Sequence, residues 1–284
     1  MKKIIAAAVA AAFVAPVFAA DVTVSGDVEY FFINGNSGKT YSDSGDQDIT
    51  VSGSSDIGNG LTATASLEVD GSDSDIASDS SLTIAGSFGS VAVGDAVDAA
   101  IEAFDEKSDK AEQGGTSGDN AVTNTHSILL KPATGIEGLD LALSYGTTTA
   151  AATSAKTITS YAAQYTMSGL TVAYGVADKE ETDAQQSSTS VSFAVGPISV
   201  GYESIQNAAF TEDKDQTNVG LAYNYGQGNV FFESGEVDTS GTKVETTAYG
   251  ISYKMGSLNL YVLNNEVDTT TDTEDTYVGV EYAF

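Results

Sequence analysis

The chain has 284 residues, with 40 Asp or Glu against 11 Lys or Arg, and its formal net charge at pH 7 is −29. All of the basic residues are lysines, so the chain has too little positive charge to neutralise nucleic-acid phosphates, and nucleic-acid binding is excluded. The absence of cysteine excludes disulfides and Cys-bound metals. The acidity favours disorder, but 14 Tyr, 11 Phe and repeated alternating segments favour a folded β protein.

The first nineteen residues have the pattern of a secretory signal peptide. Met1-Lys2-Lys3 is basic, residues 4–14 are apolar, and Val17-Phe18-Ala19 fits a cleavage site. The apolar run is too short to span a bilayer, and Pro16 interrupts it, so an anchor helix is the weaker interpretation. We therefore expect residues 1–19 to be cleaved and residues 20–284 to form one domain.

Segments with alternating apolar and polar residues follow along the rest of the chain. One face of each segment is aliphatic or aromatic, and the other is small or polar. A soluble sandwich would bury the apolar face and a membrane barrel would turn it toward lipid, so periodicity alone leaves both open. The clearest segments are 22–32, 61–69, 139–145, 170–176, 191–195, 198–202, 219–225, 248–254 and 258–262.

The connections distinguish the two folds, because short turns alternate strictly with longer polar stretches. The short turns are expected at 58–60, 89–90, 134–138, 168–169, 196–197, 226–228 and 256–257. The longer stretches are 34–46, 70–79, 97–121, 147–156, 177–187, 206–214, 238–243 and 266–274. This pattern predicts an all-β transmembrane antiparallel β-barrel of sixteen strands, with short periplasmic turns and long external loops.

Aromatic residues near the strand ends support this fold. They are placed as interfacial girdles would require: Tyr30, Phe32, Tyr145, Tyr161, Tyr165, Tyr223, Tyr225, Tyr253 and Tyr282. The last strand ends at Phe284, with Tyr282 on the same apolar face. An apolar terminal strand would be an exposed edge in a soluble protein, whereas in a closed barrel it pairs with the first strand.

Several motifs resemble those of the Gram-negative general porin family. They are Asp21-Val22-Thr23-Val24-Ser25-Gly26, the stretch 88–95, the stretch 124–132 followed by Gly138-Leu139, and the terminal Phe284. The resemblance covers nearly the whole mature chain. It implies a homotrimer in the outer membrane, in contact with lipid and lipopolysaccharide. It also implies that Tyr282 and Phe284 form a signal read by the barrel-assembly machinery.

The resemblance further implies that the third long loop, 97–121, folds into the lumen and narrows the pore. A short helix is possible at 98–104, with Ile101 and Phe104 packing the loop against the barrel wall. The alternative is a solvated external loop whose acidity only matches the overall composition. The expected constriction residues are Asp95, Asp98, Glu102, Asp105, Glu106, Asp109 and Glu112.

The charges predict which ions such a pore prefers. The family commonly faces the loop with arginines, but this chain has none, and Asp95 stands where the resemblance places one of them. Further carboxylates are expected on the lumen wall: Asp27, Glu29, Glu68, Asp140, Glu203, Glu233 and Glu281. Because rings of carboxylates attract cations and repel anions, we expect passive diffusion of small hydrophilic solutes and ions with a preference for cations.

Other functions remain open at this stage. A substrate-selective channel of the same architecture would need a site that the sequence does not reveal, and a secreted acidic surface protein disagrees with the terminal strand. A barrel enzyme would need a nucleophile beside His126, the single histidine, and no such motif is evident. No cofactor is expected. A loop-bound divalent cation is possible at 70–75, although that loop lacks the glycine and glutamate of an EF-hand.

Overall fold

The computed structural model describes residues 21–35, 40–71, 77–95, 97, 99–104, 126–147, 156–180, 185–268 and 273–284. Sixteen strands lie in these ranges. They are β1 (Asp21–Gly35), β2 (Thr40–Gly58), β3 (Leu61–Asp70), β4 (Ala77–Gly86), β5 (Gly89–Gly94), β6 (His126–Pro132), β7 (Leu139–Thr147), β8 (Thr157–Met167), β9 (Leu170–Lys179), β10 (Gln185–Val195), β11 (Ile198–Gln206), β12 (Lys214–Asn224), β13 (Asn229–Thr239), β14 (Thr242–Met255), β15 (Leu258–Asp268) and β16 (Thr273–Ala283).

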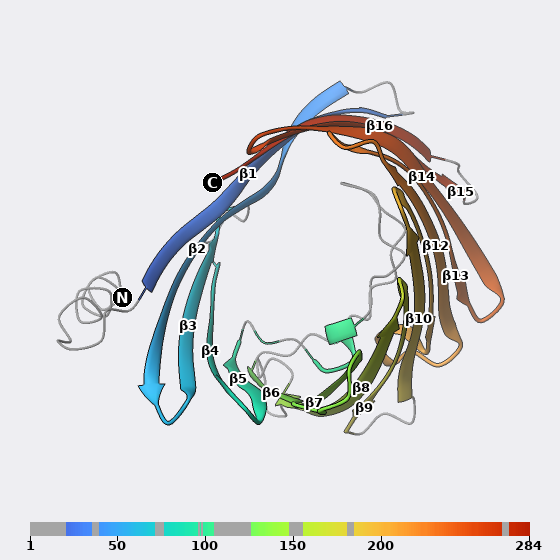
Figure 1. The fold of residues 1–284 in the computed structure, drawn as a ribbon. Coiled ribbons are helices and arrows are strands. Elements are labelled where there is room, and N and C mark those ends of the chain that lie inside the picture. Colours follow the sequence, from blue (N-terminus) through green and yellow to red (C-terminus); the bar gives the residue numbers. More distant parts are fainter. Residues whose placement is uncertain are drawn as a thin grey trace.

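The strands form one closed antiparallel barrel, in which each strand pairs with its neighbours in the sequence. Figure 1 shows the ring closing where the first and last strands lie side by side. The β1–β16 pairing runs from Asp27 opposite Ala283 to Gly35 opposite Asp275. Phe284 extends this seam, since its backbone N–H donates to Gly26 O (2.9 Å) and its carbonyl accepts from Gly26 N–H (3.1 Å). The prediction of an all-β, sixteen-stranded barrel is confirmed.

The connections differ from the prediction in three places. The stretch 238–243, expected to be long, is a two-residue turn at Ser240 and Gly241, both with positive φ (52° and 85°). Such a pair suits the tight hairpin turn that matches strand twist. The first hairpin also extends further than expected, because β2 begins at Thr40. Backbone pairing needs no apolar alternation, so polar residues beyond the membrane continue as strand. The turn expected at 89–90 lies at 87–88.

The outer face of the barrel is apolar. Its exposed residues alternate with inward ones along each strand, as Val230 and Phe232 alternate with the buried Phe231 and Glu233. All nine aromatic residues expected in the girdles are exposed, from 38% for Tyr225 to 60% for Phe32. Exposed apolar belts with aromatic girdles are what a barrel presents to lipid. No helix within the described ranges is long and apolar enough to cross a membrane.

The girdles do not continue around the whole barrel. On β2 to β6, the large apolar residues that the described part of the structure exposes are aliphatic: Ile49, Val51, Ile57, Leu82, Val93 and Ile128. Phe88, in the β4–β5 turn, is the aromatic residue of this sector. Tyr and Phe residues are exposed on β1 and on most strands from β7 onward. The outer surface therefore has an aliphatic sector and an aromatic sector.

Candidate channel lumen

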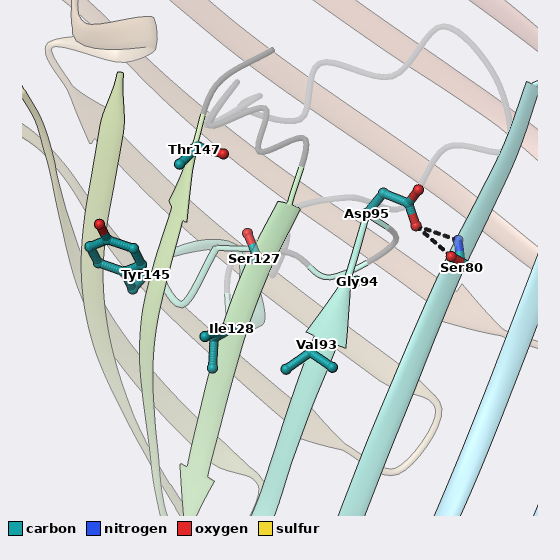
Figure 2. A pocket seen from close by; sticks show the side chains of 8 residues that line it. All are labelled: Ser80, Val93, Gly94, Asp95, Ser127, Ile128, Tyr145 and Thr147. Atoms are coloured by element: carbon teal, nitrogen blue, oxygen red, sulfur yellow. Dashed lines mark hydrogen bonds between the residues drawn. The ribbon is translucent and has the colours of Figure 1, made fainter. Parts of the chain in front are cut away.

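The chain leaves the barrel wall at Asp95, directly after β5. Because β5 ends at Gly94, the backbone of Ser80 on β4 has no strand partner on that side. The N–H and C=O groups of Ser80 therefore need other hydrogen-bond partners. Asp95 supplies them: Oδ1 accepts from the Ser80 N–H (2.6 Å) and from Ser80 Oγ (2.9 Å), as Figure 2 shows. The Asp95 N–H donates to Ser80 O (3.1 Å). The structure thus places the Asp95 carboxylate against β4, beside a hollow of about 500 Å³ that Ser127 and Thr147 also line.

The residues after Asp95 pack against the inside of the barrel. Val97, Ala100 and Phe104 form a buried apolar cluster with Leu129, Ala142, Ala162 and Ala173, which point inward from β6 to β9. The short 3₁₀ helix η1 (Glu102–Phe104) lies within the ring in Figure 1. Ile101 is 1% exposed and Phe104 8%. The predicted packing of Ile101 and Phe104 against the wall is confirmed, and the short helix is a single 3₁₀ turn.

Inward-facing serines bind the backbone of this segment. Ser144 Oγ accepts from the Ala100 N–H (2.9 Å), and Ser160 Oγ accepts from the Ile101 N–H (3.3 Å). Ser144 and Ser160 lie on β7 and β8 and also bond to each other at 2.6 Å. Ser190, on β10, donates to the carbonyl of Phe104 (3.1 Å). These bonds matter because a backbone group buried without a partner costs free energy.

Small residues on the barrel wall allow the segment that contains Ile101 to pack closely against it. Gly175, on β9, has no side chain, and Ile101 packs against the wall at this position. A Cβ at Gly175 would lie 2.8 Å from Ile101 Cγ1 and 3.1 Å from its Cα, closer than real Cβ atoms normally approach. We call the inward surface of β6 to β10 the loop-bearing wall. Its alanines, serines and Gly175 leave room for the segment 97–104.

A second segment reaches the loop-bearing wall from the β11–β12 connection. The 3₁₀ helix η2 (Ala208–Phe210) places Phe210 in a buried cluster with Ala99, Ile101, Ile158 and Ala177. Phe210 has a φ of 55°, which is uncommon for a bulky residue. Lys179 Nζ lies 5.5 Å from the centroid of its ring. Contacts with Ile101 and with the wall thus hold Phe210 in a strained backbone conformation.

The opposite inner surface, formed by β12 to β16 with β1, is packed differently. We call it the closure wall. Phe31, Ile33, Ala222, Phe231, Tyr261 and Leu263 form its buried cluster, with Tyr277 packed against it. A Cβ at Gly279 would overlap Cζ, Oη and Cε1 of Tyr261, so the far end of the ring lies directly against β16. Tyr261 Oη donates to Glu29 Oε1 (2.7 Å) across the barrel seam.

The predicted lumen carboxylates all lie on the inward-facing positions of their strands. Glu29, Glu203 and Glu233 are buried. Asp140 accepts from Gln164 Nε2 (3.4 Å), and Glu281 accepts from Asn259 Nδ2 (3.2 Å). Asp27 and Glu68 share the inward alternation of β1 and β3. The structure therefore distributes these carboxylates around the ring and does not gather them at one point.

Lysines are also present on the inner wall, which is not purely acidic. Lys131, on β6, follows the inward Leu129 by two residues, and its Nζ lies 5.7 Å from the Phe104 ring centroid. Lys179 lies on β9 and Lys254 on β14, at positions that alternate inward. The inner wall therefore carries these three lysines as well as the expected carboxylates, because all of them occupy inward positions in the alternation of their strands.

Five of the predicted constriction residues lie outside the described residues: Asp98, Asp105, Glu106, Asp109 and Glu112. Glu102 begins η1. The divalent-cation candidate at 70–75 is described only to Gly71. Among the residues that the structure describes, no group of three or more His, Cys, Asp or Glu is placed to hold a metal ion.

Sequence reasoning missed the residues that receive the inward segment. Ser144, Ser160, Ser190, Gly175 and Phe210 were not singled out. One signal was present for four of them: the inward positions of consecutive strands between 140 and 190 are mostly Ala, Ser or Gly. A wall of small inward residues next to a long loop indicates that the loop packs there. Phe210 had no comparable signal, since its partners are distant in the sequence.

A closed barrel with an apolar outer belt and a polar inner wall defines an outer-membrane channel protein. A family model described as Gram-negative porin matches residues 6–284. The chain belongs to the Gram-negative porin family, whose members form outer-membrane channels. Compared with curated protein sequences, the chain has no match.

Solved porin structures resemble the fold at low sequence identity. OmpT of Vibrio cholerae, as a loop L8 deletion mutant, has a TM-score of 0.76 and 15% identity, with 94% of this chain and 100% of that chain covered. An anion-selective porin from Comamonas acidovorans has a TM-score of 0.75 and 15% identity, covering 93% and 100%. A mutant of Rh. blastica porin has a TM-score of 0.72 and 17% identity, covering 93% and 100%. These likenesses establish the fold and leave ion preference open.

Proposed function

We propose that the chain forms a water-filled pore for passive diffusion of ions and small hydrophilic solutes, with a preference for cations. The observation that carries the proposal is the inward-facing set of carboxylates within a closed sixteen-stranded barrel. A barrel of this size is wide enough to leave an aqueous channel. Carboxylates that line a narrow aqueous passage raise the local concentration of cations.

The segment after β5 supplies the narrowing in this proposal. Residues 99–104 occupy the lumen side of β7 to β10, so the chain that follows starts inside the ring. Shortening 105–118 should raise single-channel conductance and admit larger solutes. Unchanged conductance in a correctly folded barrel would contradict the constriction role.

Ion preference is tested by the reversal potential in a KCl gradient across a planar bilayer. We expect K⁺ to permeate more readily than Cl⁻, and the preference to weaken with salt, because the Debye length falls from about 10 Å at 0.1 M to about 3 Å at 1 M. Glu102→Lys combined with Asp105→Lys should shift the reversal potential toward anions. Glu245→Lys makes the same kind of charge change outside the lumen, near the β13–β14 turn, and is the matched control. A neutral or anion-selective pore at 0.1 M KCl would overturn the cation preference.

A homotrimer is the assembly we propose. The aliphatic sector on β2 to β6 supports it, since a barrel surrounded by lipid on all sides would be expected to carry aromatic girdles throughout. A contact with another subunit over this sector would shield it from lipid, so aromatic girdles would not be needed there. Native mass spectrometry of protein extracted in mild detergent should give three copies. A monomer under conditions that preserve the folded barrel would contradict this assembly.

A further inference from the structure

A cavity of about 350 Å³ lies on the loop-bearing wall, near the short-turn mouth of the lumen. Ser90, Lys131 and Asp140 line it from β5, β6 and β7, and Phe104 of η1 contributes its ring. Its volume is at the lower end of the range for small-molecule pockets, about 300–1,000 Å³. The cavity therefore suits a ligand of amino-acid size.

The two charged groups of this cavity are close in the barrel but are not neutralised by each other. Lys131 and Asp140 lie on adjacent strands and alternate inward with Leu129 and Ala142. Lys131 is exposed and rests on the Phe104 ring at 5.7 Å from its centroid, and it has no ion-pair partner in the part of the chain that the structure describes. Asp140 is exposed and held by Gln164 through a single hydrogen bond of 3.4 Å.

The chemistry of these groups defines the ligand. An anion alone would be attracted by Lys131 and repelled by Asp140, whereas a cation alone would be attracted by Asp140 and repelled by Lys131. A zwitterion satisfies both, with its carboxylate at Lys131 and its ammonium at Asp140. An apolar or aromatic side chain on that zwitterion could pack against Phe104.

We propose that this cavity is a binding subsite for small zwitterions with an apolar side chain, such as free α-amino acids, on their way through the pore. The inference rests on the proposed channel function and adds a solute class to it. Phe104 has two roles in this proposal: it anchors the inward segment to the wall, and it forms one face of the subsite.

The test uses three solutes that share a phenyl ring and differ in charge: L-phenylalanine, 3-phenylpropanoate and 2-phenylethylammonium. Single-channel K⁺ currents are recorded at pH 7 while each solute is added from the short-turn side. We expect L-phenylalanine to interrupt the current at millimolar concentration. The two singly charged solutes should need about tenfold higher concentrations.

Two variants assign the effect to this cavity. Lys131→Met and Asp140→Asn should each raise the L-phenylalanine concentration needed for block by about tenfold, because each removes one charged contact. Lys254→Met removes a lysine from the same end of the barrel on β14, across the lumen, and should leave the block unchanged.

The outcomes separate this inference from the channel function itself. Block by 2-phenylethylammonium as strong as that by L-phenylalanine, or full block in Lys131→Met, would overturn the zwitterion subsite. A normal pore that L-phenylalanine does not affect would also overturn it and leave the channel function standing. A folded barrel with no conductance would overturn both.

Discussion

The loop-bearing wall and the closure wall lie inside the same barrel, but their inner surfaces are packed in different ways. On the loop-bearing wall, small residues of β7 to β10 leave space that the segment 97–104 fills. On the closure wall, aromatic residues of β1, β13 and β15 fill the space themselves, and those of β13 and β15 lie against inward-facing glycines. A glycine is required on both walls, but its partner belongs to a distant loop in one case and to an adjacent strand in the other.

This difference separates the residues that build the barrel from those that shape its lumen. The Tyr261 ring packs against Gly279 of β16 and hydrogen-bonds to Glu29 of β1. Its position is therefore set by the pairing of strands at the barrel seam. Ile101 contacts Gly175 only after the chain has turned inward at Asp95. Changes on the closure wall should therefore reduce barrel stability with little effect on conductance, whereas changes on the loop-bearing wall should also alter conductance.

The largest effect is expected at the seam next to the closure wall. Deleting Phe284 removes the two backbone hydrogen bonds with Gly26 and the aromatic end of the last strand. We expect folded barrel in the outer membrane to fall to background, measured by heat-modifiable gel mobility. Phe284→Tyr keeps the ring and the backbone bonds and should assemble normally. Normal yield of the deletion variant would show that the terminal residue is dispensable.

Phe210→Ala should have the next largest effect, because it empties a buried site shared by two lumen segments. Removing a buried phenyl ring costs about 3–5 kcal/mol in protein cores, and alanine keeps the Cβ and therefore the strain of the positive φ. Chemical unfolding in detergent micelles measures the loss, and open-channel current noise should increase. Lys179→Met, which removes the cation over the ring, should cost about 1 kcal/mol or less. A larger effect for Lys179→Met than for Phe210→Ala would contradict the packing role.

Gly279→Ala tests the closure wall directly. The added Cβ would meet the ring of Tyr261, which is 2% exposed and has little room to move. Such overpacking costs about 1–3 kcal/mol, and conductance should change little. In a chain that already carries Tyr261→Ala, Gly279→Ala should cost less stability than in the native chain, because the ring that the added Cβ would meet is absent. Gly53→Ala is the matched control, since its Cβ would meet nothing closer than 3.9 Å.

Gly175→Ala is the corresponding change on the loop-bearing wall and should have the smallest effect on stability. The segment around Ile101 can shift by a few tenths of an ångström, so we expect a loss of about 1 kcal/mol. The same shift moves the start of the loop that we propose narrows the pore, and single-channel conductance should change measurably. A stability loss equal to that of Gly279→Ala with unchanged conductance would remove the distinction between the two walls.

Much of the barrel could be predicted from local pattern. The alternation in segments such as 139–145 fixes which residues face outward, because successive side chains of a strand point to opposite faces. Ile101 and Phe104 could be identified as packing residues, since they are the large apolar members of an otherwise small and acidic stretch.

Other features could not be obtained in this way. Asp95 was expected at the pore, and its bonds to Ser80 depend on β5 ending one residue earlier. The stretch at 238–243 was expected to be a long loop, because polar composition does not distinguish a long loop from a polar hairpin end. The tight turn at Ser240 and Gly241 is set by backbone conformation at two residues.

The sequence by itself determined the class of fold, the strand number and the outward faces of the strands of this porin, because these follow from period-two alternation and from the spacing of turns. Only the tertiary structure decided the contacts of the inward segments: Ile101 on Gly175, Phe210 on Ile101, and Phe104 beside Lys131. These contacts join residues that are far apart in the chain, and they exist only once the ring has closed and the register of every strand pair is set.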